Sequence, residues 1–227
     1  MLASPHAVIR PYHASDRKDV RRLCCETGFL GSPIDPVFED RELFADYLTD
    51  YYLDHEPESS FVIEIDGILK GYLLGSREHE RQQRFGFRQN IRLVARGLAR
   101  YPGYGATSKK FVHWIICNGW REVPAAPKNV PHFHINLLEE ARSVPTTRAL
   151  MDTYLDYLTR CGEKQVYGQM VTFHNRRGTK MFERYGFKVL NRAEITKYRG
   201  IHPEPVYLST VIKDLTENSQ LYGSRPA

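Results

Sequence analysis

The stretch from His132 to Phe187 decides the fold; it reads HFHINLLEEARSVPTTRALMDTYLDYLTRCGEKQVYGQMVTFHNRRGTKMFERYGF. Its first six residues, His132 to Leu137, alternate polar and apolar side chains, which predicts a strand with one face of each kind. A polar loop over Glu139 to Pro145 follows, and apolar residues then recur at helical spacing until Gly162, a glycine helix stop. The stretch therefore begins with a strand, a loop and a helix.

The next unit repeats this order. Gln165 to Thr172 predicts a strand, and Asn175 is a candidate N-cap for a second helix that ends at Gly186. Phe187 then opens a further strand. Two consecutive strand-helix units with a phosphate-sized loop between them suit a nucleotide-type cofactor, because a helix N-terminus carries unpaired N–H groups and partial positive charge.

This order of elements, with the sequence FERYGF at 182–187, resembles the core of the GNAT superfamily of acyl-CoA-dependent N-acetyltransferases. The resemblance covers residues 132–190 well and the first 75 residues loosely. It implies an α/β fold with a mixed, mainly antiparallel, twisted central sheet flanked by helices. It also implies one domain over residues 1–227, with acetyl-CoA as the co-substrate and an acetyl-CoA-binding core at about 132–190.

The resemblance places the acetyl-CoA loop at Arg142 to Thr147. This loop keeps the first basic residue of the family pattern but has Pro145 and Thr147 in place of its two glycines. A proline removes one N–H group and a threonine crowds the approach to the backbone, although proline also suits the start of a helix. The predicted cofactor-binding residues are Leu137, Leu138, Arg142, Ser143, Val144, Thr146, Thr147, Arg148 and Asn175.

Two histidines are the candidate proton acceptors. His132 and His134 lie on the polar face of the first strand, and an imidazole titrates near neutral pH, so the pair can relay a proton from the amine. The His-x-His arrangement is similar to that of arylalkylamine N-acetyltransferases. The alternative is a pair of histidines that are hydrogen-bonded within the sheet. Glu139 and Glu140 are further candidate bases, although glutamates at a strand end are usually solvated.

Besides the two loop glycines, the residue at the position of the family's general acid also differs. Phe182 stands where the family usually has a tyrosine that protonates the leaving thiolate. Tyr185, about one turn later, is the candidate substitute and is equally a candidate core aromatic. The predicted catalytic residues are therefore His132, His134 and Tyr185. We expect no metal site, because the histidines lack further ligands at suitable spacing.

The N-terminal part predicts a strand, two helices and a hairpin: Ala7 to Pro11, Asp16 to Gly28, Phe38 to Leu53, and Phe61 to Leu74 around Asp66-Gly67. Residues 77–131 form an insertion that is longer than a direct link requires. Within it, Arg81 to Tyr101 predicts a basic amphipathic helix with inward Phe85, Ile91, Val94, Ala95 and Leu98. We expect the insertion to shape the substrate pocket, and a structural lid or a dimer surface is the alternative.

Composition sets further bounds. The 227 residues are 41% hydrophobic, which is ordinary for a globular domain, and a net charge of +5 suits an anionic cofactor as well as nucleic acid. Four cysteines, two of them adjacent at Cys24 and Cys25, match neither a disulfide framework nor a zinc pattern. No stretch approaches eighteen apolar residues, so we expect a cytoplasmic protein. Residues 201–227 predict a final strand, Val206 to Ile212, and a frayed tail.

Three functions are consistent with these observations. The leading one is acetyl transfer from acetyl-CoA to an amine by direct attack, with a small molecule as the expected acceptor. The alternative is a GNAT-fold pseudoenzyme that acts as a CoA sensor or protein scaffold, which the altered loop and Phe182 favour. A nucleic-acid-binding module on the helix Arg81 to Arg100 is least supported, because no nucleic-acid motif accompanies it. We expect no nucleic-acid or membrane partner, and a homodimer is an open alternative.

Overall fold

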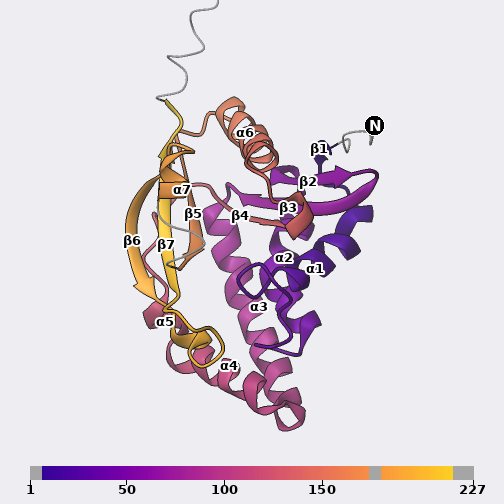
Figure 1. Ribbon diagram of the computed structural model, residues 1–227, viewed down its shortest axis with the longest axis vertical. Coiled ribbons are helices and arrows are strands. Elements are labelled where there is room, and N and C mark those ends of the chain that lie inside the picture. Colours follow the sequence, from indigo (N-terminus) through magenta and orange to yellow (C-terminus); the bar gives the residue numbers. More distant parts are fainter. Residues whose placement is uncertain (1–6, 174–179, 217–227) are drawn as a thin grey trace, which may run out of the picture.

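A seven-stranded sheet with the order β1-β2-β3-β4-β5-β7-β6 runs through the molecule. The computed structural model describes residues 7–173 and 180–216 (Figure 1). Among the neighbouring strands in these described ranges, only β4 and β5 are parallel. The strands are β1 Ala7–Pro11, β2 Ser60–Ile65, β3 Ile68–Ser76, β4 His132–Leu137, β5 Gln165–Thr172, β6 Lys188–Glu194 and β7 Tyr207–Asp214. The predicted mixed, mainly antiparallel sheet is confirmed.

Helices cover both faces of the sheet (Figure 1). The described helices are α1 Arg17–Glu26, α2 Arg41–His55, α3 His79–Arg100, α4 Ala106–Cys117, α5 Gly119–Glu122, α6 Val144–Arg160 and α7 Lys180–Glu183. One apolar cluster joins α1 and α2 to the sheet through residues such as Leu23 and Tyr72. A second cluster joins α6 to the opposite face through Phe133, Leu150 and Tyr154. Helices α3 to α5 lie between β3 and β4 in the chain, within residues 77–131.

The hairpin between β2 and β3 forms where the sequence predicts it. Asp66 and Gly67 have φ angles of +52° and +76°, so both residues are left-handed, as a two-residue type I′ turn requires. Helix α2 begins three residues later than predicted, at Arg41. The reason is that the Asp40 carboxylate accepts a hydrogen bond from the N–H of Leu43 at 3.0 Å and caps the helix there.

The sheet divides between its two parallel strands. Strands β4 and β5 pair only at His132 with Tyr167 and at Phe133 with Gly168. Beyond Phe133 the strands separate, and Figure 1 shows β5, β7 and β6 turned away from β1, β2 and β3. This separation leaves one edge of β4 without a neighbouring strand.

Helix α3 faces the protein with a different side from the one predicted. Its buried residues are Leu93 and Gly97, whereas Ile91, Val94 and Leu98 are exposed. Polar contacts fix this orientation: Arg96 pairs with Asp46 of α2, and Arg100 Nη1 lies 2.8 Å from Asp40 Oδ2. Gln89 Nε2 also donates to the Asp46 carbonyl at 2.6 Å. Of the five predicted inward residues only Phe85 is half-buried, and Ala95 is exposed.

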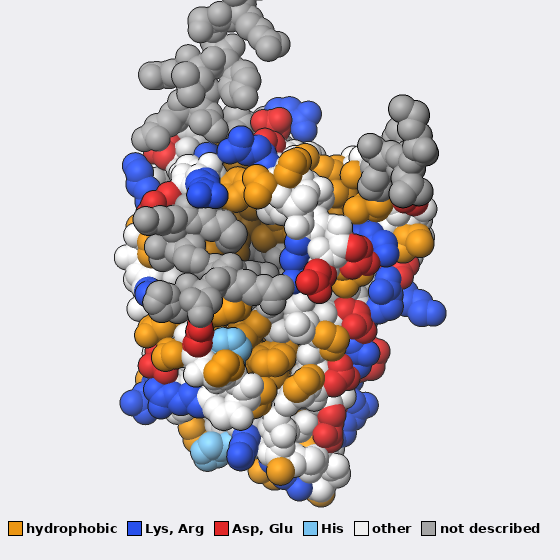
Figure 2. All heavy atoms as spheres, viewed as in Figure 1, with side chains coloured by type: hydrophobic (Ala, Val, Ile, Leu, Met, Phe, Trp, Pro, Cys, Tyr) orange, Lys and Arg blue, Asp and Glu red, His pale blue; other side chains and the backbone are white. Residues whose placement is uncertain are grey.

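Ion pairs join α1 to α2 at the surface. Arg21 contacts Asp46 at 2.7 Å and Asp50 at 3.0 Å, and Arg17 contacts Asp50 at 2.9 Å. Figure 2 shows acidic and basic side chains intermixed along the right margin, where α1 and α2 lie. Within the described ranges, no helix is long and apolar enough to cross a membrane.

Candidate functional site

The open edge of β4 is the centre of the candidate site. The Leu138 N–H donates to the Lys70 carbonyl at 2.8 Å, on the side of β3. The N–H and C=O groups of successive residues in a strand point alternately to its two sides. The backbone groups of His134 and Asn136 therefore also face β3. The backbone groups of Ile135 and Leu137 face away from β3. The Tyr167 N–H, which donates to the Pro131 carbonyl at 2.9 Å, confirms this alternation on the β5 side. Ile135 therefore directs its N–H and its C=O into the gap between β4 and β5.

The two predicted histidines share one face of β4, as expected, and they meet a tyrosine from α2. The Tyr52 hydroxyl lies 2.8 Å from His132 Nε2. The Tyr52 ring also meets His134 edge-on, with ring centroids 5.4 Å apart. Gln82 of α3 places its Nε2 atom 3.2 Å from His132 Nε2, so the insertion reaches the histidine pair.

Burial changes the titration of both histidines. It lowers the pKa of His132 to about 3, assisted by the nearby His134 and His79, and it lowers the pKa of His134 to about 4. The expectation that this pair titrates near neutral pH is therefore wrong. Because His132 is buried, with 6% of its surface exposed, an imidazolium there would lose most of its hydration. Both imidazoles are neutral at physiological pH, and the lowered pKa makes each a weaker base than a solvated histidine.

The low pKa of His132 predicts how stability changes with pH. The unfolded chain takes up this proton near pH 6.5, whereas the folded chain takes it up only near pH 3. The unfolding free energy should therefore fall, by up to about 1.4 kcal/mol per pH unit from this group, as the pH drops from 6 to 4. Chemical denaturation across this range should give a smaller fall for His132→Gln. Parallel curves for the two proteins would contradict the assignment.

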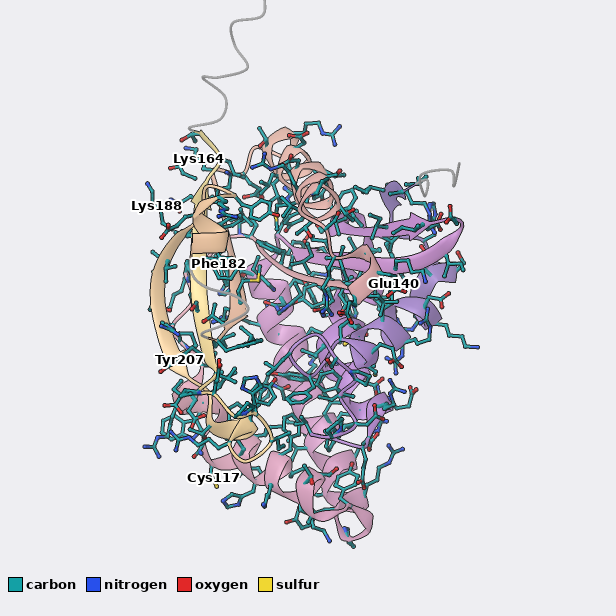
Figure 3. The ribbon with its side chains drawn as sticks, viewed as in Figure 1. Cys117, Glu140, Lys164, Phe182, Lys188 and Tyr207 are labelled. Carbon is teal, nitrogen blue, oxygen red and sulfur yellow. The ribbon has the colours of Figure 1, made fainter. Side chains whose placement is uncertain are left out.

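Tyr185 and Phe182 lie on the other face of the sheet from the histidines. Phe182, labelled in Figure 3, is buried in the apolar cluster beneath α6. Tyr185 packs against the same cluster, and the Arg148 guanidinium lies 5.7 Å from the centre of its ring. The structure therefore places Tyr185 beside the start of α6 and does not bring it together with His132 and His134.

Arg142 makes structural contacts in the described chain. Its Nε donates to the Leu137 carbonyl at 2.8 Å, and its Nη2 donates to the Gly31 carbonyl. The side chain thus joins the segment after α1 to the end of β4. Leu137 is buried beneath α6, whereas Leu138 packs against the cluster on the α1 and α2 face. The predicted role of Arg142 in phosphate binding stays a prediction, and part of its donor capacity is already used.

Helix α6 begins at Val144, within the predicted loop, and Ser143 is its N-cap. The Ser143 hydroxyl accepts from the Thr146 N–H at 3.2 Å, and the Thr147 N–H donates to the Ser143 carbonyl at 3.0 Å. Pro145 has no N–H group. Among the described hydrogen bonds none uses the Val144 N–H, which leaves this group for a ligand. The start of the helix therefore offers fewer backbone donors than the glycine-containing family pattern.

The remaining candidates divide between described and undescribed residues. Arg148 is exposed on the first turns of α6, and its Nη2 donates to the Arg184 carbonyl at 3.3 Å. Glu140 pairs with Lys70 at 2.9 Å on the exposed surface, and this hydrogen bond lowers its pKa. Asn175 lies outside the described residues. In the described ranges no group of three or more His, Cys, Asp or Glu side chains is arranged to hold a metal ion.

The insertion also contacts the elements on the β5 side of the gap. The Glu122 carboxylate of α5 accepts from the Thr196 N–H at 2.6 Å, from the Thr196 hydroxyl at 2.7 Å and from Trp114 Nε1 at 2.6 Å. Gln169 Nε2 of β5 donates to the Pro124 carbonyl at 2.9 Å. These contacts fix the insertion against β5 and the segment between β6 and β7.

Three contributors were not found from the sequence. The open backbone of Ile135 was not identified, because strand separation depends on where β5 lies. Tyr52 and Gln82 were not identified either, since each belongs to a helix whose facing side tertiary packing decides. The spacing of aromatic and polar residues in α2 and α3 does not predict that Tyr52 and Gln82 contact His132.

Comparisons with known proteins agree with this geometry at the level of fold. No protein-family model matches the chain, and no curated protein matches it. The crystal structure of SsHAT shares 24% sequence identity with this chain and has a TM-score of 0.63, covering 93% of this chain and 99% of SsHAT.

Two further solved structures are similar over most of their length. A Drosophila melanogaster polyamine N-acetyltransferase, which catalyses the formation of N-acetylagmatine, has 14% identity and a TM-score of 0.54, with 92% of this chain and 100% of that chain covered. A putative acetyltransferase from Salmonella typhimurium, solved with its cofactor acetyl-CoA, has 11% identity and a TM-score of 0.52, with coverage of 92% and 94%. The chain therefore has the fold of the GNAT-family acetyltransferases.

Proposed function

We propose that this protein transfers an acetyl group from acetyl-CoA to the amine of a small molecule by direct attack. The observation that carries the proposal is the open edge of β4, where the Ile135 backbone faces the gap beside β5. His132 and His134 lie on the same strand, next to this gap. The similarity to acetyltransferase structures supports the reaction class, and the polyamine enzyme among them supports a small acceptor.

The open edge suits the pantetheine part of acetyl-CoA. Pantetheine carries amide groups, which can pair with a strand edge as a neighbouring strand would. At the phosphate end, the chain offers the Val144 N–H, the hydroxyl groups of Thr146 and Thr147, and the cationic Arg148, whereas the Ser143 hydroxyl donates to Thr146 Oγ1 at 2.8 Å. These donors fit an anion at a helix N-terminus.

The reaction then follows from these groups. The amine nitrogen attacks the thioester carbon, and the Ile135 N–H stabilises the negative charge that develops on the carbonyl oxygen. The neutral His134, which is half-buried and not fully enclosed, accepts the proton that the nitrogen loses. The C–S bond breaks, and the leaving thiolate takes up a proton. We assign this second proton to solvent, because Phe182 has no hydroxyl and Tyr185 packs beside Arg148.

A second candidate function is a CoA sensor or scaffold without catalysis. Specific observations favour it: Pro145 lacks an N–H at the start of α6, Arg142 is bonded to backbone carbonyls, and Phe182 replaces the family's acid. In this alternative the protein has the acetyltransferase fold but does not catalyse acetyl transfer.

Calorimetric titration with acetyl-CoA, CoA and desulfo-CoA tests both candidates. Micromolar dissociation constants for acetyl-CoA are expected, and release of free thiol in the presence of an amine library should then identify the acceptor. Binding without thiol release for any amine would favour the sensor. No heat at millimolar acetyl-CoA would contradict acetyl transfer and CoA sensing, and would favour the scaffold.

A further inference from the structure

The outward side of α3 carries an apolar stripe, formed by Phe87, Ile91, Val94 and Leu98, which we call the α3 stripe. The exposed fractions of these residues are 71%, 59%, 52% and 57%. Their spacing of four, three and four residues places them on one side of the helix. Single exposed apolar residues are common on protein surfaces, whereas a continuous stripe marks an interaction surface.

The inward side of α3 combines apolar contacts of Leu93 and Phe85 with several polar contacts. The inward side of α3 is held by polar contacts of Gln89 and Arg96 with Asp46, and by Arg100 with Asp40. A surface helix usually buries its apolar side and exposes its polar one. Because the inward side is already satisfied, the α3 stripe does not serve the fold of the described chain.

The charge next to the α3 stripe is positive. Between Arg81 and Tyr104 the sequence contains six arginines and no aspartate or glutamate. Arg88 and Arg92 flank the α3 stripe, are exposed, and make no ion pair within residues 7–173 and 180–216. An occupant that takes up apolar side chains and carries negative charge would complement this surface.

A second copy of the chain fits this surface poorly. It would bring like charges together, because each copy carries the same arginines. A stable interface also needs roughly 800 Å² from each partner, which is more than four side chains of one helix supply. The apolar side of a single helix, by contrast, can enter the boundary between lipid headgroups and acyl chains to a depth of about 5–10 Å.

We propose that the α3 stripe docks on a bilayer surface that carries anionic lipid headgroups. Phe87, Ile91, Val94 and Leu98 enter the headgroup and acyl boundary, while Arg88 and Arg92 contact the headgroup phosphates and carboxylates. The long arginine side chains can extend from the apolar surface to the headgroups. This placement differs from the sequence-based expectation of no membrane partner, and it is independent of the proposed acetyl transfer.

Co-sedimentation of the full chain with vesicles tests the proposal. Binding to phosphatidylcholine vesicles with added phosphatidylserine should exceed binding to phosphatidylcholine alone and should weaken as salt rises. Ile91→Glu should weaken it at least tenfold. The double variant Arg88→Gln and Arg92→Gln should weaken it roughly 25-fold, since each charge near an anionic surface is worth about fivefold.

Ile68→Glu is the matched control. Ile68 is 54% exposed at the start of β3, so the same substitution there should leave vesicle binding unchanged. The proposal is overturned if the protein does not sediment with anionic vesicles, or if Ile68→Glu and Ile91→Glu weaken binding equally. It is also overturned if light scattering shows a dimer that Ile91→Glu dissociates while vesicles are not bound.

Discussion

Ile135→Pro is expected to weaken acetyl-CoA binding at least tenfold and to slow acetyl transfer by about 100- to 1,000-fold. The substitution removes the N–H that faces the gap between β4 and β5 and fills the gap with the proline ring. Loss of one donor to a developing oxyanion accounts for most of the rate effect. The N–H that is lost takes no part in the ladder with β3, so the sheet should persist.

Two substitutions on the same strand distinguish this effect from a general loss of structure. Ile135→Val keeps the backbone N–H and should retain binding and turnover within a few fold. Asn136→Pro removes an N–H that faces β3 and should destabilise the protein itself, because proline cannot donate to a central ladder. Calorimetry gives the dissociation constant for each variant, and thermal unfolding reports its stability. Unchanged acetyl-CoA binding in a folded Ile135→Pro protein would remove the strand edge from the site.

Tyr154→Ala should lower the unfolding free energy by about 3–5 kcal/mol. Tyr154 of α6 is fully buried, and its ring packs against Phe133 and Phe61 with centroid distances of 5.8 and 6.3 Å. It occupies the space beside Gly75, where a Cβ atom would lie 2.4 Å from the ring. Removal of the ring would leave a cavity between α6 and the sheet. In a protein of this size the melting temperature should fall by roughly 10 °C.

Tyr154→Phe separates the hydroxyl from the ring. The Tyr154 hydroxyl donates to the His132 carbonyl at 2.9 Å, so its removal should cost about 1–2 kcal/mol. Chemical denaturation of both variants gives the comparison. A loss below about 1 kcal/mol for Tyr154→Ala would show that the surrounding residues collapse into the space, contrary to the tight packing beside Gly75.

The sequence predicted the parts of the fold that local patterns encode. The alternation over His132 to Leu137 marked β4, Asp66-Gly67 marked the hairpin, and Pro145 indicated that a helix begins nearby. The side chains or backbone angles that define these features lie within a few residues of one another. The sequence also showed that His132 and His134 share a face, because that follows from the period of a strand.

Tertiary structure decided the features that depend on distant neighbours. The sequence of α3 allows either its apolar residues or its arginines to face the protein. The pairing of Arg96 with Asp46 and of Arg100 with Asp40 places the arginine side inward, so Ile91 and Leu98 face outward. Burial, assisted by the nearby His134, lowered the pKa of His132 to about 3. Only the separation of β5 from β4 opened the backbone of Ile135. Periodicity specifies which residues lie on one side of an element, whereas the partner that covers that side is set by chain segments far away in the sequence.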